Sequence, residues 1–180
     1  AKPFKIEDII AIKNEVSNLK GVTAENSGMA NVVFGNKSNS SLIVGTTSDY
    51  FIIKDWEVEQ GRIFEEGELS SGKSVCILGT TVVKNLFGDE NPIGATIRIK
   101  NFPCSVIGVL ASKGASSFGR DQDEVVITPL KMYQRKIQGN LDVSSIIVSV
   151  MEEKYIEDAK EQIISLMQDR RAVKVGESDN

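Results

Sequence analysis

The chain has 180 residues, a formal net charge of −4 and no histidine. A chain of this length can bury a hydrophobic core in one domain or in two small subdomains. Its net acidic charge and scattered Lys and Arg disfavour nucleic-acid binding, which needs a basic patch. Because histidine is the commonest general base and metal ligand, its absence excludes Ser–His and Cys–His nucleophile systems within this chain.

The first third of the chain is predicted to form a helix followed by a pair of strands. Apolar residues recur at helical spacing between residues 6 and 19, and Gly21 is expected to close that helix. Two apolar segments, 22–34 and 41–46, flank a polar stretch, which indicates two strands joined by a hairpin loop. A helical turn is expected at 49–54.

Residues 67–74, GELSSGKS, fit the phosphate-loop pattern GxxxxGKS. That pattern needs a buried strand before it and a helix after it, so that loop amides face the phosphates. Here residues 62–66 are not a buried strand, residues 75–78 read as a strand, and three glutamates lie close enough to repel phosphate. We therefore interpret this segment as a mobile surface turn and not as a nucleotide site.

The segment from 75 to 78 is a short apolar run between glycines, which suits a buried strand. A helix is predicted to follow, with Thr80 or Thr81 as its cap and Gly88 at its C-terminal end.

Two further strands are predicted after a turn that contains proline and glycine. Ile97 and Ile99 alternate with polar residues, as on a half-buried strand, and residues 104–110 return as a second strand. The chain's two cysteines, Cys76 and Cys104, fall in these apolar strands. Buried free thiols are favoured, and a disulfide is possible if the two strands are neighbours in an oxidising compartment.

Residues 113–123 form a long polar loop with one exposed-looking aromatic side chain, Phe118. Such loops often carry functional contacts. Asp121, Asp123 and Glu124 alternate with other residues like part of a cation loop, but a calcium site needs more oxygen ligands and a distal carboxylate. A solvated turn is therefore favoured over a metal site.

The last third is predicted to alternate helices and strands. A helix starts at Pro129 and ends at Gly139, because proline suits the first helical position and glycine the C-terminal cap. The periodicity then predicts a strand over 143–150, an amphipathic helix over 156–167 and a final strand over 172–175. No apolar run reaches the roughly 18 residues of a membrane span.

A family resemblance is carried by the run ILG…LFGDENPIGATIRI…VIGVL, which extends from Ile77 to Leu110. It resembles the extracytoplasmic core domain of MacB-type ABC-transporter permeases, part of the broader FtsX-like permease group. The flanking residues that share this resemblance are Tyr50, Phe51, Trp56, Gly61, Arg62, Ile63, Phe64, Ser116, Ser117, Phe118, Gly119, Asp121, Asp123 and Pro129.

The resemblance implies an α+β fold in two parts. A discontinuous, porter-like α/β subdomain would comprise residues 1–62 and 128–180, and a smaller β-rich lobe would be inserted at 63–127. The order of predicted elements is compatible with such an insertion, although a single mixed domain fits that order as well. The resemblance also implies that both ends of the chain continue into transmembrane helices.

The function implied by the resemblance is transmission of movement. A non-catalytic extracytoplasmic domain, at the periplasmic side of the cytoplasmic membrane, would pass the ATP-driven motion of the membrane helices to a partner. The implied partners are a periplasmic adaptor (membrane-fusion) protein, an ATPase domain or subunit, and a second permease copy in a dimer, with no nucleic acid and no cofactor. Exporters, lipoprotein-release systems and cell-division regulators all remain open.

One alternative is a sensor domain that captures a peptide, antibiotic or lipid between its two lobes, because clefts between subdomains are preferred ligand sites. An enzyme is the least favoured class, and no catalytic residue is expected. For the docking role, six residues in two segments are expected to face a partner: Ser116, Ser117, Phe118, Gly67, Leu69 and Gly72.

Overall fold

The computed structural model describes the backbone of residues 3–178 and the side chains of residues 3–172. The described chain is a mixed α and β structure, so the predicted α+β class is confirmed. The strands are β1 (Leu19–Phe34), β2 (Lys37–Thr46), β3 (Val58–Gly61), β4 (Val75–Leu78), β5 (Thr96–Ile99), β6 (Phe102–Leu110), β7 (Val125–Pro129) and β8 (Ile146–Val150).

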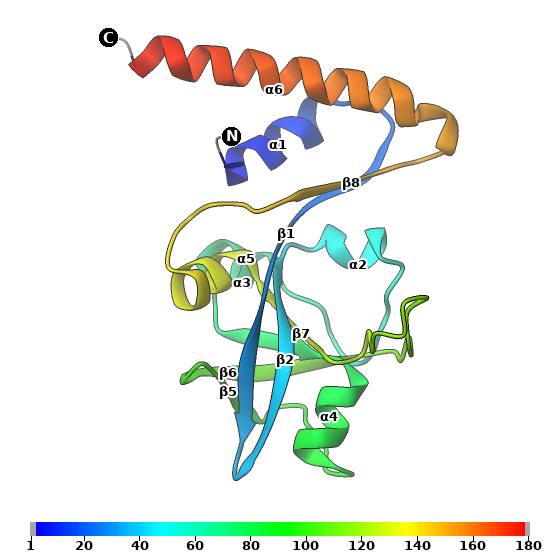
Figure 1. Ribbon diagram of the computed structural model, residues 1–180, viewed down its shortest axis with the longest axis vertical. Coiled ribbons are helices and arrows are strands. Elements are labelled where there is room, and N and C mark those ends of the chain that lie inside the picture. The colour runs from blue at the N-terminus through cyan, green and yellow to red at the C-terminus, as the bar shows by residue number, and fades with distance from the viewer. Residues whose placement is uncertain (1–2, 179–180) are drawn as a thin grey trace.

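The helices lie above, beside and below these strands (Figure 1). They are α1 (Ile6–Glu15), α2 (Asp49–Ile53), α3 (Glu66–Ser71), α4 (Thr80–Phe87), α5 (Leu130–Met132), the π-helical segment η1 (Tyr133–Gln138), the 3-10 turn η2 (Glu153–Tyr155) and α6 (Ile156–Ser178).

Six strands pair into a closed ring. The second half of β1 pairs with β2 from Glu25 to Phe34, and its end also pairs with β5, where Val32 faces Ile99. The pairs β2–β7, β7–β4, β4–β6 and β6–β5 complete the circuit, and β3 adds to β6. Closure leaves the ring strands few free edges and encloses an apolar interior.

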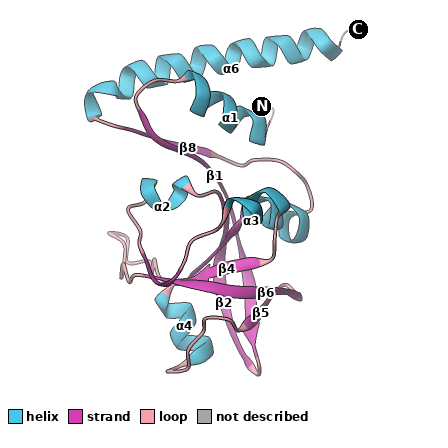
Figure 2. Cartoon of the chain, turned by 180° about the vertical axis from the view of Figure 1, so that it is seen from behind, coloured by secondary structure: helices cyan, strands magenta, loops and turns pink. Residues whose placement is uncertain are grey.

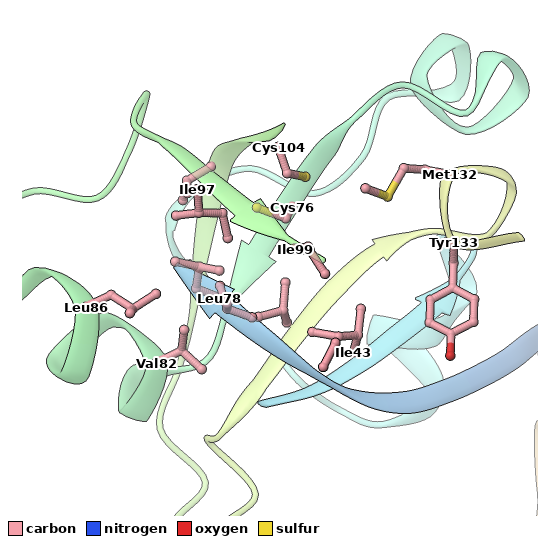
Figure 3. Close-up of a cluster of buried hydrophobic side chains, with 14 of the residues drawn as sticks. Ile43, Cys76, Leu78, Val82, Leu86, Ile97, Ile99, Cys104, Met132 and Tyr133 are labelled. Carbon is pink, nitrogen blue, oxygen red and sulfur yellow. The ribbon is translucent and has the colours of Figure 1, made fainter. Parts of the chain in front are cut away.

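The interior of this ring is filled by alternating strand side chains and by side chains from α4, α5 and η1. On β5 the exposure alternates along the strand, so Ile97 and Ile99 point inward, as their spacing predicts. Helix α4 adds Val82 and Leu86 to the same cluster (Figure 3). Each of these side chains is almost fully buried, so this cluster is a main source of hydrophobic stabilisation.

Cys76 and Cys104 also belong to this cluster, on the paired strands β4 and β6 (Figure 3). Both are free thiols, as favoured from the sequence, and both are buried. Burial raises the pKa of the Cys76 thiol well above its ordinary value, and the neighbouring Cys104 adds to this effect. The Cys76 thiol is therefore protected from reagents in water.

A second body lies on top of the ring and shares β1 with it. The first half of β1, from Leu19 to Ala24, pairs with β8, and α1 and α6 cover these two strands (Figures 1 and 2). Ile146, Val148 and Val150 pack on the core of this upper layer, as their predicted common face requires. One continuous strand of 16 residues therefore connects the two bodies.

The predicted division at 62/63 and 127/128 stays a prediction. Strand pairing crosses both positions, because β1 and β2 contribute to the ring together with β4, β5, β6 and β7.

Two expectations in the first third were wrong in their boundaries. Helix α1 ends at Glu15, where Val16 is already extended and Asn18 takes a φ of 62°, so Gly21 lies inside β1. A side chain at Gly21 would lie 3.2 Å from Cβ of Asp49, so glycine there lets α2 pack against the strand. The hairpin loop is also shorter than expected, because β2 starts at Lys37.

Two further corrections concern segments 67–74 and 172–175. Residues Glu66–Ser71 form the short helix α3, which ends at Gly72 with a φ of 69°, where a surface turn was expected. The final strand over 172–175 is not formed, because α6 continues to Ser178. Extending an existing helix adds one hydrogen bond for each residue fixed, which outweighs the weak strand preference of four residues.

Candidate partner-contact surface

The loop between β6 and β7 is organised by one buried carboxylate. Asp123 is 3% exposed, and its oxygens accept hydrogen bonds from the amides of Lys113 and Gly114, both at 2.8 Å, and from the Ser112 hydroxyl at 2.9 Å. Burial opposes ionisation of Asp123, but these hydrogen bonds outweigh it and lower its pKa below the ordinary value. The charged Asp123 carboxylate, near the end of the loop, thus holds residues 112–114 at its start.

The loop itself is a narrow turn with an aromatic side chain at its tip. The amide of Ser116 donates to the carbonyl of Arg120 at 2.7 Å, and the amide of Gly119 donates to the carbonyl of Ser116 at 2.9 Å. Phe118 is 96% exposed, Ser117 is exposed and Ser116 is half-buried. The backbone therefore holds the Phe118 ring in water at the tip of the loop, where it is accessible from outside.

A second carboxylate ties the loop to α4. The hydroxyl of Thr81 donates to Oδ2 of Asp121 at 2.6 Å, and the amide of Asp123 donates to Oδ1 of Asp121 at 2.9 Å. The expectation that Thr80 or Thr81 caps α4 was wrong, because the capping residue is Gly79 and no side chain caps it.

Gly79 cannot carry a side chain at this position. A Cβ there would lie 2.1 Å from the carbonyl oxygen of Asp123, so close packing of the loop on the start of α4 requires glycine. Among the described residues, no three His, Cys, Asp or Glu side chains are grouped to hold a metal ion.

The other predicted contact segment, α3, presents its residues unequally. Gly67 is exposed, and a Cβ there would have open space around it. Leu69 is half-buried and packs on the cluster that contains Trp56. Gly72 is half-buried, and a Cβ there would lie 3.0 Å from Lys131. Of these three predicted contact residues, Gly67 is thus the most accessible.

Cations from the α5–η1 segment cover the C-terminal end of α3. Lys131 Nζ donates to the Ser70 carbonyl and Arg135 Nη1 donates to the Ser71 carbonyl, each at 2.9 Å. Positive charges are favourable at a helix C-terminus, where carbonyl groups lack partners within the helix. The phosphate-loop motif thus forms a cation-covered helix end, which lacks the amide cradle that phosphate requires.

The N-terminal end of α3 is held by an ion pair. Arg62 donates to both carboxylate oxygens of Glu68, at 2.7 and 3.1 Å, and the Glu65 amide donates to Glu68 Oε1 at 2.9 Å. Glu68 is 5% exposed. The Arg62 hydrogen bond is the largest cause of a lowered Glu68 pKa, and it prevails over burial, which acts in the opposite direction.

The structure does not bring the two predicted segments together. The loop from 112 to 124, yellow-green in Figure 1, projects from one side of the ring, whereas α3 lies toward the other side beside α5 (Figures 1 and 2). The six predicted residues are therefore two separate candidate surfaces, and the better exposed one contains Phe118.

A pocket of about 200 Å³ next to this loop was missed from the sequence. Trp56 lies in its wall and donates from Nε1 to the Ala111 carbonyl at 2.8 Å. Lys113 Nζ lies 4.7 Å from the centroid of the Trp56 ring and donates to the Lys54 carbonyl at 2.8 Å. The pocket walls are far apart in the sequence, so no local pattern could have indicated it.

Comparison with known proteins agrees with this fold. A model of the MacB-like periplasmic core domain family matches residues 1–166. The macrolide export ATP-binding/permease protein MacB of Rhodospirillum rubrum is 40% identical over 129 residues, which cover 71% of this chain and 20% of that protein. MacB of Chlorobium luteolum is 32% identical over 174 residues, which cover 97% of this chain and 26% of that protein.

Solved structures give the same result. The periplasmic region of MacB from Actinobacillus actinomycetemcomitans superposes with a TM-score of 0.82 at 25% identity, covering 96% of this chain and 76% of that one. The extracellular domain of YknZ, a noncanonic ABC-type transporter from Gram-positive bacteria, superposes with a TM-score of 0.80 at 24% identity, covering 94% of this chain and 85% of that one.

These matches define a class, the extracytoplasmic domains of ABC-transporter permeases, whose porter-like fold this chain shares. Within that class, the chain belongs to the MacB-like periplasmic core domain family, as the resemblance implied. It spans about a quarter or less of the length of the curated relatives described above. Among the helices that the structure describes, none is long and apolar enough to cross a membrane.

Proposed function

We propose that this domain is a non-catalytic coupling element, which passes movement of membrane helices, driven by ATP hydrolysis, to a periplasmic adaptor. The observation that supports this most strongly is β1, which pairs with β8 in the upper layer and with β2 and β5 in the ring. At about 3.3 Å per residue, a strand of this length spans about 50 Å. A displacement of the upper layer would therefore move the ring as one body.

The two helices of the upper layer are joined by an ion pair. Nε of Arg170, on α6, donates to Oδ1 of Asp8, on α1, at 2.9 Å. In this proposal both helices connect to membrane segments of the permease, so a force on either helix reaches the other. Export of a substrate would follow from movement of the adaptor.

The rigidity of this coupling can be measured in the full-length permease. Spin labels are placed on Lys37→Cys, at the hairpin turn, and Lys160→Cys, on α6, which are both exposed. The buried native cysteines are expected to stay unlabelled. ATP binding is expected to leave the distance within one chain unchanged while it changes the distance between the two copies of the dimer. A change of the distance within one chain would contradict rigid coupling.

The docking part of the proposal places the adaptor on the loop that carries Phe118. The adaptor encoded next to the permease is captured with the full-length permease, and Phe118→Ala is expected to reduce its capture about tenfold, because an exposed aromatic side chain is a typical interface anchor. Phe102→Ala is the matched control, since Phe102 is 38% exposed at the start of β6. No capture by the native permease would reject the docking role, and equal capture by the Phe118 variant would reject this loop as the contact.

A further inference from the structure

The two bodies of the domain meet at a joint where β1 changes its partner strand. Pairing of β1 with β8 ends at Ala24, and pairing with β2 begins at Glu25. The chain crosses the joint again through the irregular linker of residues 139–145, which runs from η1 up to β8 (Figure 1). Strand ends and irregular linkers can both bend, so further contacts are needed to fix the angle between the bodies.

Asn26 supplies such contacts on β1, directly after the joint. Its side chain is fully buried, and its Nδ2 donates to Oε1 of Gln138 and to the Asp142 carbonyl, both at 2.8 Å. Its Oδ1 accepts a hydrogen bond from the Ser144 amide, also at 2.8 Å. Asn26 thus uses both of its donor hydrogens and its acceptor to hold β1 against the end of η1 and the linker.

Thr23 supplies the corresponding contacts on the upper side of the joint. It lies opposite Ile147 of β8 in the upper layer, and its side chain is fully buried. Its hydroxyl lies 2.9 Å from the Thr46 hydroxyl, at the end of β2, and 2.7 Å from the Thr47 hydroxyl. The Thr47 amide also donates to it at 3.2 Å. Thr23 thus ties the upper half of β1 to the ring.

Two other polar contacts near the joint are less protected or less complete. Asp49, on α2, accepts a hydrogen bond from the Val22 amide at 3.0 Å, but its side chain is 19% exposed, so water can replace this bond. Gln134, on η1, is fully buried and donates to the Leu141 carbonyl at 3.0 Å, but its Oε1 has no partner among the described residues. Both are therefore weaker constraints on the joint than the two fully buried, fully paired side chains of β1.

Apolar packing across the joint has a different effect from these hydrogen bonds. The α5–η1 segment contributes Leu130 to the apolar cluster of the upper layer, and Met132 and Tyr133 to the cluster of the ring. This packing favours contact between the bodies, but the hydrophobic effect is non-directional. Hydrogen bonds depend steeply on angle, and buried polar networks that are fully paired make a structure rigid. The hydrogen bonds are therefore expected to set the orientation of the two bodies.

We propose that Asn26 and Thr23 form a polar lock that fixes the orientation of the upper layer relative to the ring. Without the lock each body stays folded, because each keeps its own apolar cluster, but the joint samples a wider range of angles. The functional meaning of the lock rests on the proposed coupling role, since the ring follows the upper layer only if the joint between them does not bend.

The test measures the spread of distances between the bodies within one chain of the full-length permease. The spin-label pair Lys37→Cys and Lys160→Cys reports on their angle, because the hairpin turn and α6 lie at opposite ends of the domain (Figure 1). Labelled chains are diluted with unlabelled chains, so that pairs within one chain dominate. The native joint is expected to give one narrow distribution. Asn26→Asp should widen it about twofold, because a carboxylate keeps the side-chain shape but cannot donate to the Asp142 carbonyl.

A second variant and two controls separate orientation from stability. Thr23→Val removes the hydroxyl and keeps the shape, so it should also widen the distribution, and it decides the test if the Asn26 variant does not fold. Asn31→Asp makes the same exchange at an exposed asparagine of β1 and should leave the width unchanged. Val82→Ala should lower the unfolding temperature, because Val82 is buried in the ring cluster, and should also leave the width unchanged.

Three outcomes would overturn the lock: a broad distribution in the native permease, a native-like width in both lock variants, or equal widening by Val82→Ala. Failure of the coupling role gives a different result. If ATP leaves the distance between the two copies unchanged while the lock variants widen the distribution within one chain, the lock is retained and the coupling is rejected. If ATP changes the distance between the copies while neither variant widens the distribution, the coupling is retained and the lock is rejected.

Discussion

Arg170 and Asp8 are 162 residues apart in the chain, yet Nε of Arg170 donates to Oδ1 of Asp8 at 2.9 Å. Asp8 is 3% exposed, and its other carboxylate oxygen accepts a hydrogen bond from the Lys5 amide at 2.8 Å. The carboxylate thus closes the first turn of α1 and also fixes α6 against it. Together with the apolar cluster that both helices share, this contact connects the first and last helices, on which the proposed coupling depends.

We predict that Asp8→Asn destabilises the domain by about 2–3 kcal/mol, because it leaves the Arg170 guanidinium without its counter-charge in a half-buried site. The measurement is urea unfolding at neutral pH. Asp158→Asn, an exposed position in the first turn of α6, serves as the control and is expected to cost less than about 0.5 kcal/mol. Equal losses in both variants would show that the Asp8 contact has no special role.

The Arg62–Glu68 pair predicts a pH dependence of stability. The pKa of Glu68 is lowered in the folded state, mainly by the Arg62 hydrogen bond. A depressed carboxyl pKa stabilises the fold above the unfolded-state pKa of about 4.3, and this contribution is lost as the pH falls through the folded-state value. Glu68→Gln should therefore be less stable than the native domain at pH 7, and the difference should shrink in acid.

The measurement for this pair is the free energy of unfolding of both proteins over a pH series. Glu66→Gln is the matched control, because Glu66 is exposed in the same helix. A constant difference between the native domain and the Glu68 variant at every pH would contradict an electrostatic origin.

Asp123→Asn is predicted to loosen the loop while the ring stays folded. The variant loses the charged acceptor for the amides of Lys113 and Gly114, and hydrogen bonds to a charged group contribute about 1.5–3 kcal/mol. Amide hydrogen exchange should accelerate at these two residues and change little in β4. Unchanged protection of the loop amides would show that Asp123 does not organise it, and exposed Asp89→Asn is the control.

Glycine substitutions separate a required glycine from a tolerant one. Gly79→Ala should destabilise by several kcal/mol, because its Cβ would lie 2.1 Å from the Asp123 carbonyl oxygen and the backbone would have to move. Gly67→Ala should be neutral or stabilise by about 0.5–1 kcal/mol, since it meets open space within a helix. Thermal unfolding of both variants measures this contrast, and a loss at Gly67 as large as that at Gly79 would refute it.

Much of the fold could be predicted where the signal is local. Ile97 and Ile99 alternate along one strand, and Gly139 ends its helix with a φ of 87°, as expected from its position. Local sequence patterns did not predict a strand whose conformation depends on pairing with a strand distant in the sequence. β3 has one apolar residue, Val58, that is half-buried, and its strand conformation comes from pairing with β6.

The candidate site also has one feature that the sequence indicated and others that only the structure revealed. Phe118 was singled out from the sequence as an exposed-looking aromatic residue in a long polar loop. The structure confirms that it is exposed, and its contact with a partner stays a prediction. The role of Asp123 as the organising anion could not be foreseen, because its partners became neighbours only when the loop folded back on itself. The sequence also gave no indication that α3 and the loop from 112 to 124 lie on different sides of the ring.

The order of residues alone determined the family, the α+β class and the absence of histidine chemistry, because these follow from motifs, periodicity and residue types. The tertiary structure decided that β1 joins both bodies, that the phosphate-loop motif forms a helix end covered by Lys131 and Arg135, and that Trp56 and Arg120 line one pocket. Each of these depends on contacts between residues distant in the chain, and such contacts are selected by global packing and not by local preference.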